Sequence, residues 1–262
     1  MTEDENRVII QGTSGMFGAS LTGKRDKDED YIHCTAIKDV QIAILCDGMG
    51  GTKNGELASK EASRAFIRGI KMIRKKYSDR WVSKKYRHSR YKKLIDICHN
   101  KVASITGKSG ESGTTLTALV TTYDKKIPVS LDLIHIGDSR CYKIKGNNAE
   151  LLTSDHSVTG DMLRAKYIEI HEIAETPGNN SLTRNIGDEN KSSADIMTLE
   201  IDSNYFYLIC CDGVWDPLHK EEGFWTPNVD CNSQNYVDMI VNEAIIRGST
   251  DNCSALVVNL LS

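Results

Sequence analysis

The chain has 262 residues, of which 39% are hydrophobic and 26% are charged, so it can form the core of an ordinary globular protein. No apolar run is long enough to span a bilayer, and the acidic start MTEDENRVII has no apolar core, so we expect neither a membrane helix nor a secretory signal. The net charge of −3 argues against nucleic acid as a partner. The eight cysteines form no C-x-x-C pair and lie mostly in apolar runs, which favours reduced thiols and a cytoplasmic protein.

Apolar runs with the spacing of β-strands recur along the chain and are bounded by turn residues. The predicted strands are 31–37, 40–46, 115–123, 129–136, 140–145, 196–201, 205–211 and 253–260. The residues KD join the first two strands, and DSN joins 196–201 to 205–211. Links this short predict that the joined strands are antiparallel neighbours, because a parallel crossover needs a dozen or more residues.

Three segments have apolar residues at helical spacing. They are Gly55–Lys76, Leu94–Ile105 and Ser233–Ile246. Antiparallel strands with helices in separate blocks indicate an α+β protein built in layers. The sequence contains neither an internal repeat nor a linker rich in Pro, Gly or Ser, so we predict one domain over residues 1–262.

Acidic residues stand at the ends of five predicted strands. They are Asp47, Asp138, Asp212, Asp251 and the adjacent pair Glu29 and Asp30. One such acid is usually a turn residue, but five on adjoining strand ends would repel one another unless a cation neutralises them. A set of oxygen ligands without Cys or His spacing suits Mg²⁺ or Mn²⁺. The glycines of DGMGG, residues 47–51, would let a backbone carbonyl reach an ion and keep its open side clear.

Nine short motifs in one order extend across nearly the whole chain. They are GKRDKDED at 23–30, DGMGG at 47–51, GELAS at 55–59, SGTTLTALV from 112, HIGDSRCY from 135, LLTSDHS from 151, SLTRNIG from 181, CCDGVWD from 210 and STDNCSALVV from 249. Together they resemble the metal-dependent serine/threonine protein phosphatases of type 2C, and the spelling DGMGG is similar to the bacterial branch. The resemblance implies a four-layer α-β-β-α sandwich of two antiparallel sheets packed face to face and flanked by helices.

The resemblance also implies two bound metal ions, Mn²⁺ or Mg²⁺. Asp47 would bridge them, and Gly48 would offer its backbone carbonyl to one. The remaining ligands would be Asp212 and Asp251 for the first ion, and Asp30 with Glu29, through water, for the second. A weaker third site would use Asp138, Asp212 and Asp216. Asn252 would orient the loop that carries Asp251.

The implied activity is hydrolysis of phosphoserine and phosphothreonine in proteins, the products of a serine/threonine kinase, by a metal-activated water. Arg25 would bind the substrate phosphate through two parallel hydrogen bonds from its guanidinium group. Arg25 and Asp47 are the predicted catalytic residues. Two alternatives stay open. One is a pseudophosphatase that binds without catalysis, although the residues Asp30, Asp47, Asp212 and Asp251 argue against it. The other is a phosphatase of small phosphoesters.

The chain departs from the family pattern at three places. Met49 stands where many relatives have a His proposed as the general acid, so protonation of the leaving group falls to a water or another group. Asp28 replaces the usual Asn before the Glu-Asp pair and adds a charge near the second metal. The segment Val158–Asn180, where the family has a mobile flap, is short, so substrate preference is not predicted.

One segment, Arg68–Lys93, is strongly basic, with twelve Lys or Arg residues against one acid and a local charge of +11. The simple interpretation is a solvated helix face and loop. The alternative is a docking surface for an acidic or phosphorylated partner, with Trp81, Tyr86 and Tyr91 as anchors. We expect neither nucleic acid nor a membrane as the partner.

Overall fold

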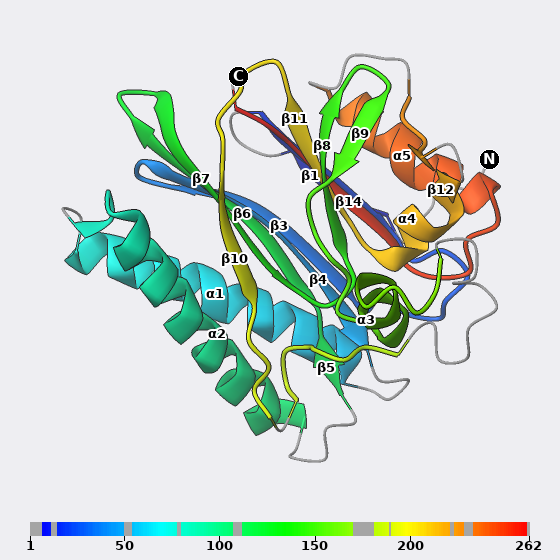
Figure 1. Ribbon diagram of the computed structural model, residues 1–262, viewed down its shortest axis with the longest axis horizontal. Helices are drawn as coiled ribbons and strands as arrows, with labels where there is room; N and C mark the ends of the chain where they lie inside the picture. Colours follow the sequence, from blue (N-terminus) through cyan, green and yellow to red (C-terminus); the bar gives the residue numbers. More distant parts are fainter. Residues whose placement is uncertain are drawn as a thin grey trace.

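The computed structural model describes residues 7–11, 15–49, 54–77, 80–106, 112–169, 181–188, 190–220, 223–227 and 233–260. Two large antiparallel sheets pack face to face, and helices cover their outer surfaces (Figure 1). The predicted four-layer α+β sandwich is therefore confirmed.

The two sheets together contain every strand predicted from the sequence. The first has the order β1 (Arg7–Gln11), β2 (Met16–Leu21), β14 (Cys253–Asn259), β11 (Phe206–Cys210), β8 (Arg140–Lys145) and β9 (Asn148–Leu151). The second has the order β10 (Asp195–Leu199), β7 (Ile127–Ile136), β6 (Leu116–Asp124), β4 (Val40–Met49) and β3 (Asp30–Ile37), with the short β5 (Gly113–Thr114) paired to the end of β4. The sequence analysis missed β1, β2, β5 and β9, and also the small hairpin of β12 (His219–Lys220) and β13 (Gly223–Phe224).

Strand β4 is apolar on both faces because both faces are covered. Ala43 and Leu45 belong to the core between the sheets, which also includes the apolar face of the first sheet. Ile42, Ile44 and Cys46 belong to a second core between this sheet and its helices. Successive side chains of a strand point to opposite faces, so a strand in the middle of four layers has a continuous apolar sequence.

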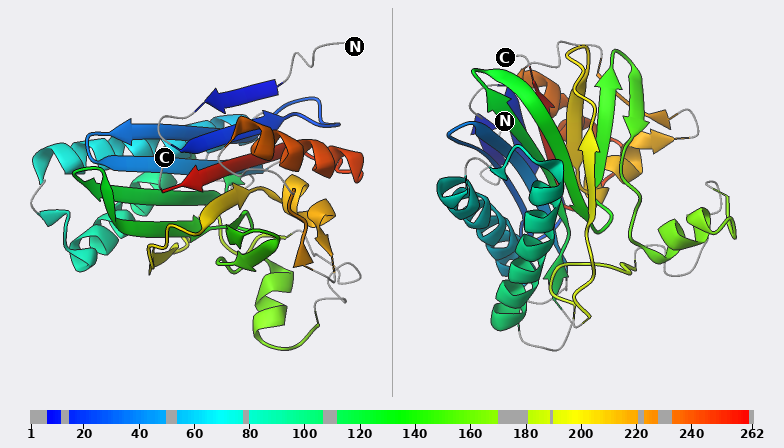
Figure 2. Two further views of the ribbon diagram at one scale, coloured as in Figure 1. Left: turned by 90° about the horizontal axis from the view of Figure 1, so that it is seen from above. Right: turned by 60° about the vertical axis from the view of Figure 1, so that its left-hand side comes forward.

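The helices form the two outer layers. Helices α1 (Gly55–Lys76) and α2 (Lys84–Thr106) pack on the second sheet, and α4 (Asp212–Leu218) and α5 (Gln234–Ile246) pack on the first (Figures 1 and 2). The predicted bounds of α1 are confirmed, and α5 begins after Ser233, whose side chain accepts a hydrogen bond from the Tyr236 amide. The short helix α3 (Val158–Arg164) was not predicted. None of the described helices is long and apolar enough to cross a membrane.

Two predictions about the elements are wrong. Helix α2 begins at Lys84 instead of Leu94, because two of the buried positions in its first half are the polar residues Arg87 and Tyr91, which do not produce an apolar pattern. Strands β10 and β11 lie in different sheets although only a short link joins them. Their link passes from one sheet to the other, so the rule that short links join neighbours does not apply there.

Two of the three aromatic anchors predicted for docking are also wrong. The side chain of Trp81 is 1% exposed and donates its Nε1 hydrogen to Thr122 Oγ1 at 2.9 Å. Tyr91 is fully buried and donates its hydroxyl hydrogen to Asp132 Oδ2 at 2.9 Å. Both aromatic rings belong to the core between α2 and the second sheet, and only Tyr86 remains half-buried.

Candidate metal centre

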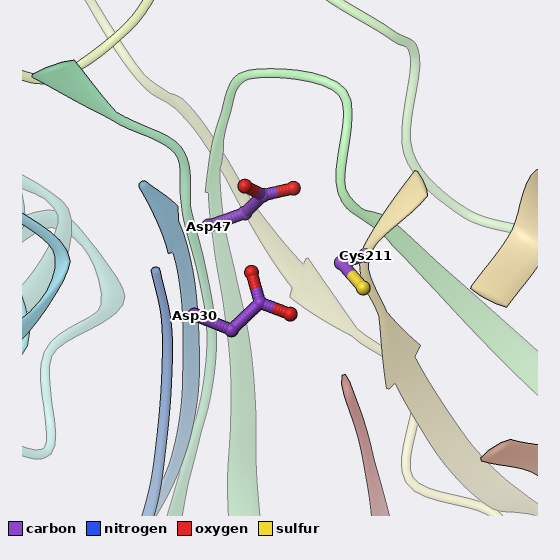
Figure 3. A group of neighbouring side chains, drawn as sticks. All are labelled: Asp30, Asp47 and Cys211. Atoms are coloured by element: carbon purple, nitrogen blue, oxygen red, sulfur yellow. The ribbon is translucent and has the colours of Figure 1, made fainter. Parts of the chain in front are cut away.

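Asp30 and Asp47 come together because their strands are antiparallel neighbours. Asp30 opens β3, and the register places it opposite Asp47 near the end of β4. The amide of Asp47 donates to Thr115 Oγ1 at 2.9 Å, which fixes the end of β4 against β6. Figure 3 shows the two carboxylates beside the side chain of Cys211. One ligand atom from each of the three residues lies within 4.8 Å of the others.

Asp212 and Asp251 approach from the first sheet. Strands β11 and β14 are antiparallel neighbours with Cys210 opposite Ala255, so the residue after β11 and the residues before β14 meet at one end. Asp212 opens α4 there and accepts a hydrogen bond from the Gly213 amide at 2.6 Å. The two loops touch closely, since a Cβ on Gly213 would lie 2.0 Å from the Asn252 carbonyl oxygen.

Asn252 joins this end of the first sheet to the segment that carries the Glu-Asp pair. Its Nδ2 group donates to the carbonyl oxygens of Thr22 and Lys27 at 2.8 and 2.9 Å. Its Oδ1 atom accepts from the Glu29 amide at 2.9 Å. The buried Asn252 side chain therefore fixes the loop before β3 as well as lying next to Asp251.

The carboxylates raise one another's pKa. Burial, with Asp28 and Asp212 nearby, raises the pKa of Asp30 to about 8. Burial raises the pKa of Asp47 well above its ordinary value, and the charges of Asp30, Asp212, Asp138 and Asp251 add to the effect. Burial and then Asp251 raise the pKa of Asp212 to about 6. This cluster therefore needs a positive charge to stay ionised.

One oxygen of the cluster shows where such a charge fits. Asp30 is 9% exposed, and its Oδ2 atom is buried without a hydrogen-bond partner among the described residues. A buried carboxylate oxygen without a donor is rare in folded proteins because its desolvation is not repaid. Oxygen donors of this kind are those that Mg²⁺ and Mn²⁺ prefer, so the residues present fit a divalent cation.

Arg25 lies beside the acids. Its Nη2 atom lies 2.6 Å from Asp251 Oδ2, and its side chain is 53% exposed. Burial raises the pKa of Glu29, and Arg25 opposes that rise, which places the guanidinium near this carboxylate as well. An exposed guanidinium at the edge of a cation site is accessible to a substrate phosphate.

The residues predicted for a third ion also lie near one another. Burial, followed by the charge of Asp212, raises the pKa of Asp138 well above its usual range. Asp216 is exposed one turn after Asp212 and contributes to raising the pKa of that residue. Trp215 donates its Nε1 hydrogen to the Asp138 carbonyl oxygen at 2.9 Å and so holds the loop that carries Asp138 against α4.

Comparison with known proteins identifies the chain. The family described as "Protein phosphatase 2C" matches residues 17–253. The chain belongs to this family. The serine/threonine phosphatase stp of Listeria welshimeri is 26% identical over 239 residues, which cover 89% of this chain and 90% of that protein. The protein phosphatase PhpP of Streptococcus pneumoniae is 26% identical over 241 residues, 90% of this chain and 93% of that protein.

Solved structures support the same fold. The structure of serine/threonine phosphatase Stp1 from Staphylococcus aureus superposes on this phosphatase 2C chain with a TM-score of 0.78 at 23% identity, covering 95% of this chain and 96% of that one. A serine/threonine phosphatase from Mycobacterium smegmatis, solved with cacodylate, gives a TM-score of 0.73 at 23% identity, with 95% and 99% covered. The predicted family and enzyme class, a protein serine/threonine phosphatase, are confirmed.

Cys211 is the residue of this phosphatase 2C centre that the sequence analysis missed. It was interpreted as one of many buried cysteines, although it stands directly before Asp212. Its Sγ atom donates to the Asn252 carbonyl oxygen at 3.3 Å and accepts from the Ser254 amide at 3.2 Å. Burial raises its pKa well above the usual range, with Asp30 and Asp47 adding to the rise. Cys211 is therefore a buried thiol beside Asp30 and Asp47.

Gly48 is required for a reason that the sequence analysis did not give. A Cβ at this position would lie 2.4 Å from the Gly55 carbonyl oxygen and 2.6 Å from that of Glu29. The neighbouring backbone, where α1 begins against β4, therefore excludes a side chain there. Gly50 and Gly51, expected to keep the open side of an ion clear, lie outside the described residues.

Each of the three departures from the phosphatase 2C pattern falls at least partly within the described residues. Met49 is the last residue of β4 and pairs with Gly113, and its thioether side chain has no proton to donate. Asp28 accepts hydrogen bonds from the Ser20 hydroxyl at 2.7 Å and from the Asp30 amide at 3.0 Å, so its carboxylate stabilises the turn before β3. Within the expected flap Val158–Asn180, α3 is present and residues 170–180 lie outside the described part.

Proposed function

We propose that this chain hydrolyses phosphoserine and phosphothreonine in proteins with the help of two divalent ions, Mn²⁺ or Mg²⁺. The observation that carries the proposal is the convergence of Asp30, Asp47, Asp212 and Asp251, with Asp30 Oδ2 lacking a donor of its own. Among the described residues, the one group of three His, Cys, Asp or Glu side chains close enough to hold a metal ion includes two of these acids, Asp30 and Asp47.

The proposed ligands are the residues that the strand ends bring together. Asp47 would bridge the two ions, and the Gly48 carbonyl would serve one of them. Asp212 and Asp251 would complete the first ion, and Asp30 with Glu29, through water, would serve the second. When bound, such ions lower the pKa of a water and offset the charge on a phosphoryl group. Asp138, Asp212 and Asp216 would hold a weaker third ion.

Arg25 is the proposed phosphate-binding residue. Its planar guanidinium can donate two parallel hydrogen bonds to phosphate oxygens, and the exposed position beside Asp251 makes it accessible. Met49 offers no proton to the leaving alkoxide, so we infer that the serine or threonine product takes its proton from water.

The proposed partners are phosphoproteins, the products of a serine/threonine kinase. A cytoplasmic location is proposed on the cysteines, because the seven described ones are all free and six of them are buried. Two other functions remain as competitors: a pseudophosphatase, against which the complete set of predicted ligands argues, and a phosphatase of small phosphoesters.

A chelator-controlled assay on paired peptides tests the proposal. We expect a phosphothreonine peptide to be hydrolysed with added Mn²⁺ and not after EDTA, and a matched phosphotyrosine peptide to be hydrolysed far more slowly. Asp47→Asn should remove most activity and keep the fold, as measured by circular dichroism. Turnover in EDTA would refute the metal mechanism. Hydrolysis of p-nitrophenyl phosphate but of neither peptide would favour the small-phosphoester alternative. A fully metal-loaded protein that hydrolyses none of these substrates would favour the pseudophosphatase.

A further inference from the structure

A stripe of unpaired lysines lies on α2, apart from the acidic cluster. Its members line one face of the helix around a groove of about 740 Å³. They are Lys84, Lys85, His88, Ser89, Lys92 and Lys93. The spacing of four residues between successive pairs places them in line along the helix, because residues three and four apart are neighbours on its surface. We call this set the α2 stripe. None of the predicted metal ligands belongs to it.

The lysines of the α2 stripe have no local counter-charge. All four are exposed, and none forms an ion pair within the part of the chain that the structure describes. Along α2 the first acidic residue is Asp96, which also forms no ion pair with a described residue. The cations therefore face solvent without neutralisation by a described side chain.

The charges of α2 are also arranged against the stability of the helix itself. In α1 the acid Glu56 lies in the first turn and three basic residues lie in the last turn, which is the favourable arrangement for the helix dipole. Helix α2 has the reverse: no acid in its first turn, which begins with Lys84 and Lys85, and no basic residue in its last. The basic residues in the last turn of α1 thus have a structural explanation, and the four lysines of the α2 stripe have none among the described residues.

The field of the stripe extends to its histidine. Burial lowers the pKa of His88, and Lys84, Arg87 and Lys92 lower it further against the opposing charge of Asp132. The His88 Nε2 atom lies 2.9 Å from Thr198 Oγ1 of β10, so the ring is fixed between helix and sheet. A site that keeps positive charges close together and uncompensated is suited to an anion.

We propose that the α2 stripe is a docking surface for an acidic segment of the phosphoprotein substrate, distinct from the phosphate that reaches the metal centre. The identity of the partner as a substrate rests on the proposed function. From Lys84 to Lys93 the helix rises by about 14 Å, which matches about four residues of an extended chain. The stripe is thus long enough for a short run of Asp, Glu or phosphorylated residues.

Lysines suit a flexible acidic peptide better than nucleic acid. Arginine is the residue that binds phosphate groups through two parallel hydrogen bonds, and the arginines nearest the stripe are engaged elsewhere. Arg87 is buried against Asp132, and Arg90 lies over the ring of Tyr86 at 4.9 Å. The net charge of −3 would also repel nucleic acid and anionic lipid from the rest of the surface.

Docking at the stripe would raise the local concentration of the substrate without touching the reacting atoms. We therefore expect it to lower KM for substrates with an acidic segment and to leave kcat unchanged. We expect no such benefit for short phosphopeptides that lack an acidic segment.

A binding experiment without metal tests the surface by itself. The probe is a fluorescein-labelled, unphosphorylated octaglutamate peptide, followed by anisotropy in EDTA at low salt. The variant is Lys85→Glu/Lys92→Glu, and the control with the same charge change is Lys125→Glu/Lys126→Glu, two exposed lysines in the turn between β6 and β7. We expect the control variant to bind the peptide like the wild type and the stripe variant to bind it at least about tenfold more weakly. The melting temperature of the stripe variant should not fall, because acids in the first turn of a helix are favourable.

Equal binding by the stripe variant and the wild type would overturn the proposal, as would an equal loss in the control. Phosphatidylserine vesicles or single-stranded DNA that bind the wild type more tightly than the peptide would overturn the choice of partner.

An activity measurement then tests the link to substrate. The stripe variant should raise KM for a phosphothreonine peptide with a glutamate-rich extension and leave kcat/KM for the unextended peptide unchanged; an unchanged KM for both would contradict substrate docking. Failure of the wild type to hydrolyse either peptide would refute the proposed function and would leave the binding result standing.

Discussion

Asp30 has a buried carboxylate oxygen that meets no donor among the described residues, and its neighbour Asp47 faces four other acids. These residues were predicted because an acidic residue directly before or after an apolar run can be recognised in the sequence. The role of Cys211 was not predicted, since a cysteine in an apolar run is typical of a core position. The face-to-face packing of the two sheets brings it beside Asp30 and Asp47. The close packing that requires Gly48 was equally invisible, because Gly55 and Glu29 reach it through the fold.

Replacing Arg25 by Ala tests its role in binding phosphate. A hydrogen bond to a charged group contributes about 1.5–3 kcal/mol, so KM for a phosphothreonine peptide should rise by about tenfold or more. If substrate and transition state are bound equally, kcat should change little. The ion pair with Asp251 is exposed, so the free energy of unfolding should fall by no more than about 1 kcal/mol. A wild-type KM in steady-state kinetics would contradict the assignment.

Among the elements, α2 shows most clearly what the sequence could and could not predict. Strand β4 and helix α1 were predicted within a few residues, because their apolar spacing is regular and their ends have clear signals. The first half of α2 was missed because its inward face uses Arg87 and Tyr91, which bind the buried Asp132 of β7. The placement of β10 and β11 in different sheets was likewise set by packing between layers, which no local pattern encodes.

The buried ion pair of α2 should dominate the stability of that layer. Arg87 Nε lies 2.5 Å from Asp132 Oδ2, and both side chains are almost fully buried. Arg87→Met would leave the buried carboxylate of Asp132 without its arginine partner, although the Tyr91 and Thr198 hydroxyls still donate to it and His88 Nε2 lies 3.8 Å away. Unfolding in urea should therefore show a loss of about 3–5 kcal/mol. The control Arg68→Met, at an exposed position of α1, should change stability by about 0.5 kcal/mol at most. Equal effects of both variants would contradict the structural role of Arg87.

At the scale of the whole molecule, the fold brings residues far apart in sequence to one end of the two sheets. The second sheet contributes Asp30 and Asp47, and the ends of β11 and β14 contribute Asp212 and Asp251. Asn252 links the two groups through three hydrogen bonds to the segment from Thr22 to Glu29. The acidic cluster and the stability of the folded chain are therefore coupled.

This coupling predicts how stability depends on pH. Burial raises the folded pKa of Asp30 from 3.8 to about 8 and that of Asp212 to about 6. Between the unfolded pKa of 3.8 and these raised folded pKa values, the folded chain binds more protons than the unfolded chain. The free energy of unfolding should therefore fall as pH rises from about 4 to about 8. In EDTA, the melting temperature should therefore be lower at pH 8 than at pH 5, and Asp30→Asn should flatten the decline. If the melting temperature of the wild type in EDTA instead rose with pH, the folded pKa values of these acids would not be raised.

The central claim is that the converging acids bind divalent ions. A Mn²⁺ titration followed by electron paramagnetic resonance tests it most directly, because bound ions lose the sharp signal of free Mn²⁺. The wild type should bind about two ions tightly, with affinity that rises with pH as the carboxyl protons are displaced, and Asp47→Asn should lose this binding while its circular dichroism spectrum stays unchanged. Equal Mn²⁺ binding by the wild type and a folded Asp47→Asn variant, or no tight binding by either, would contradict the account.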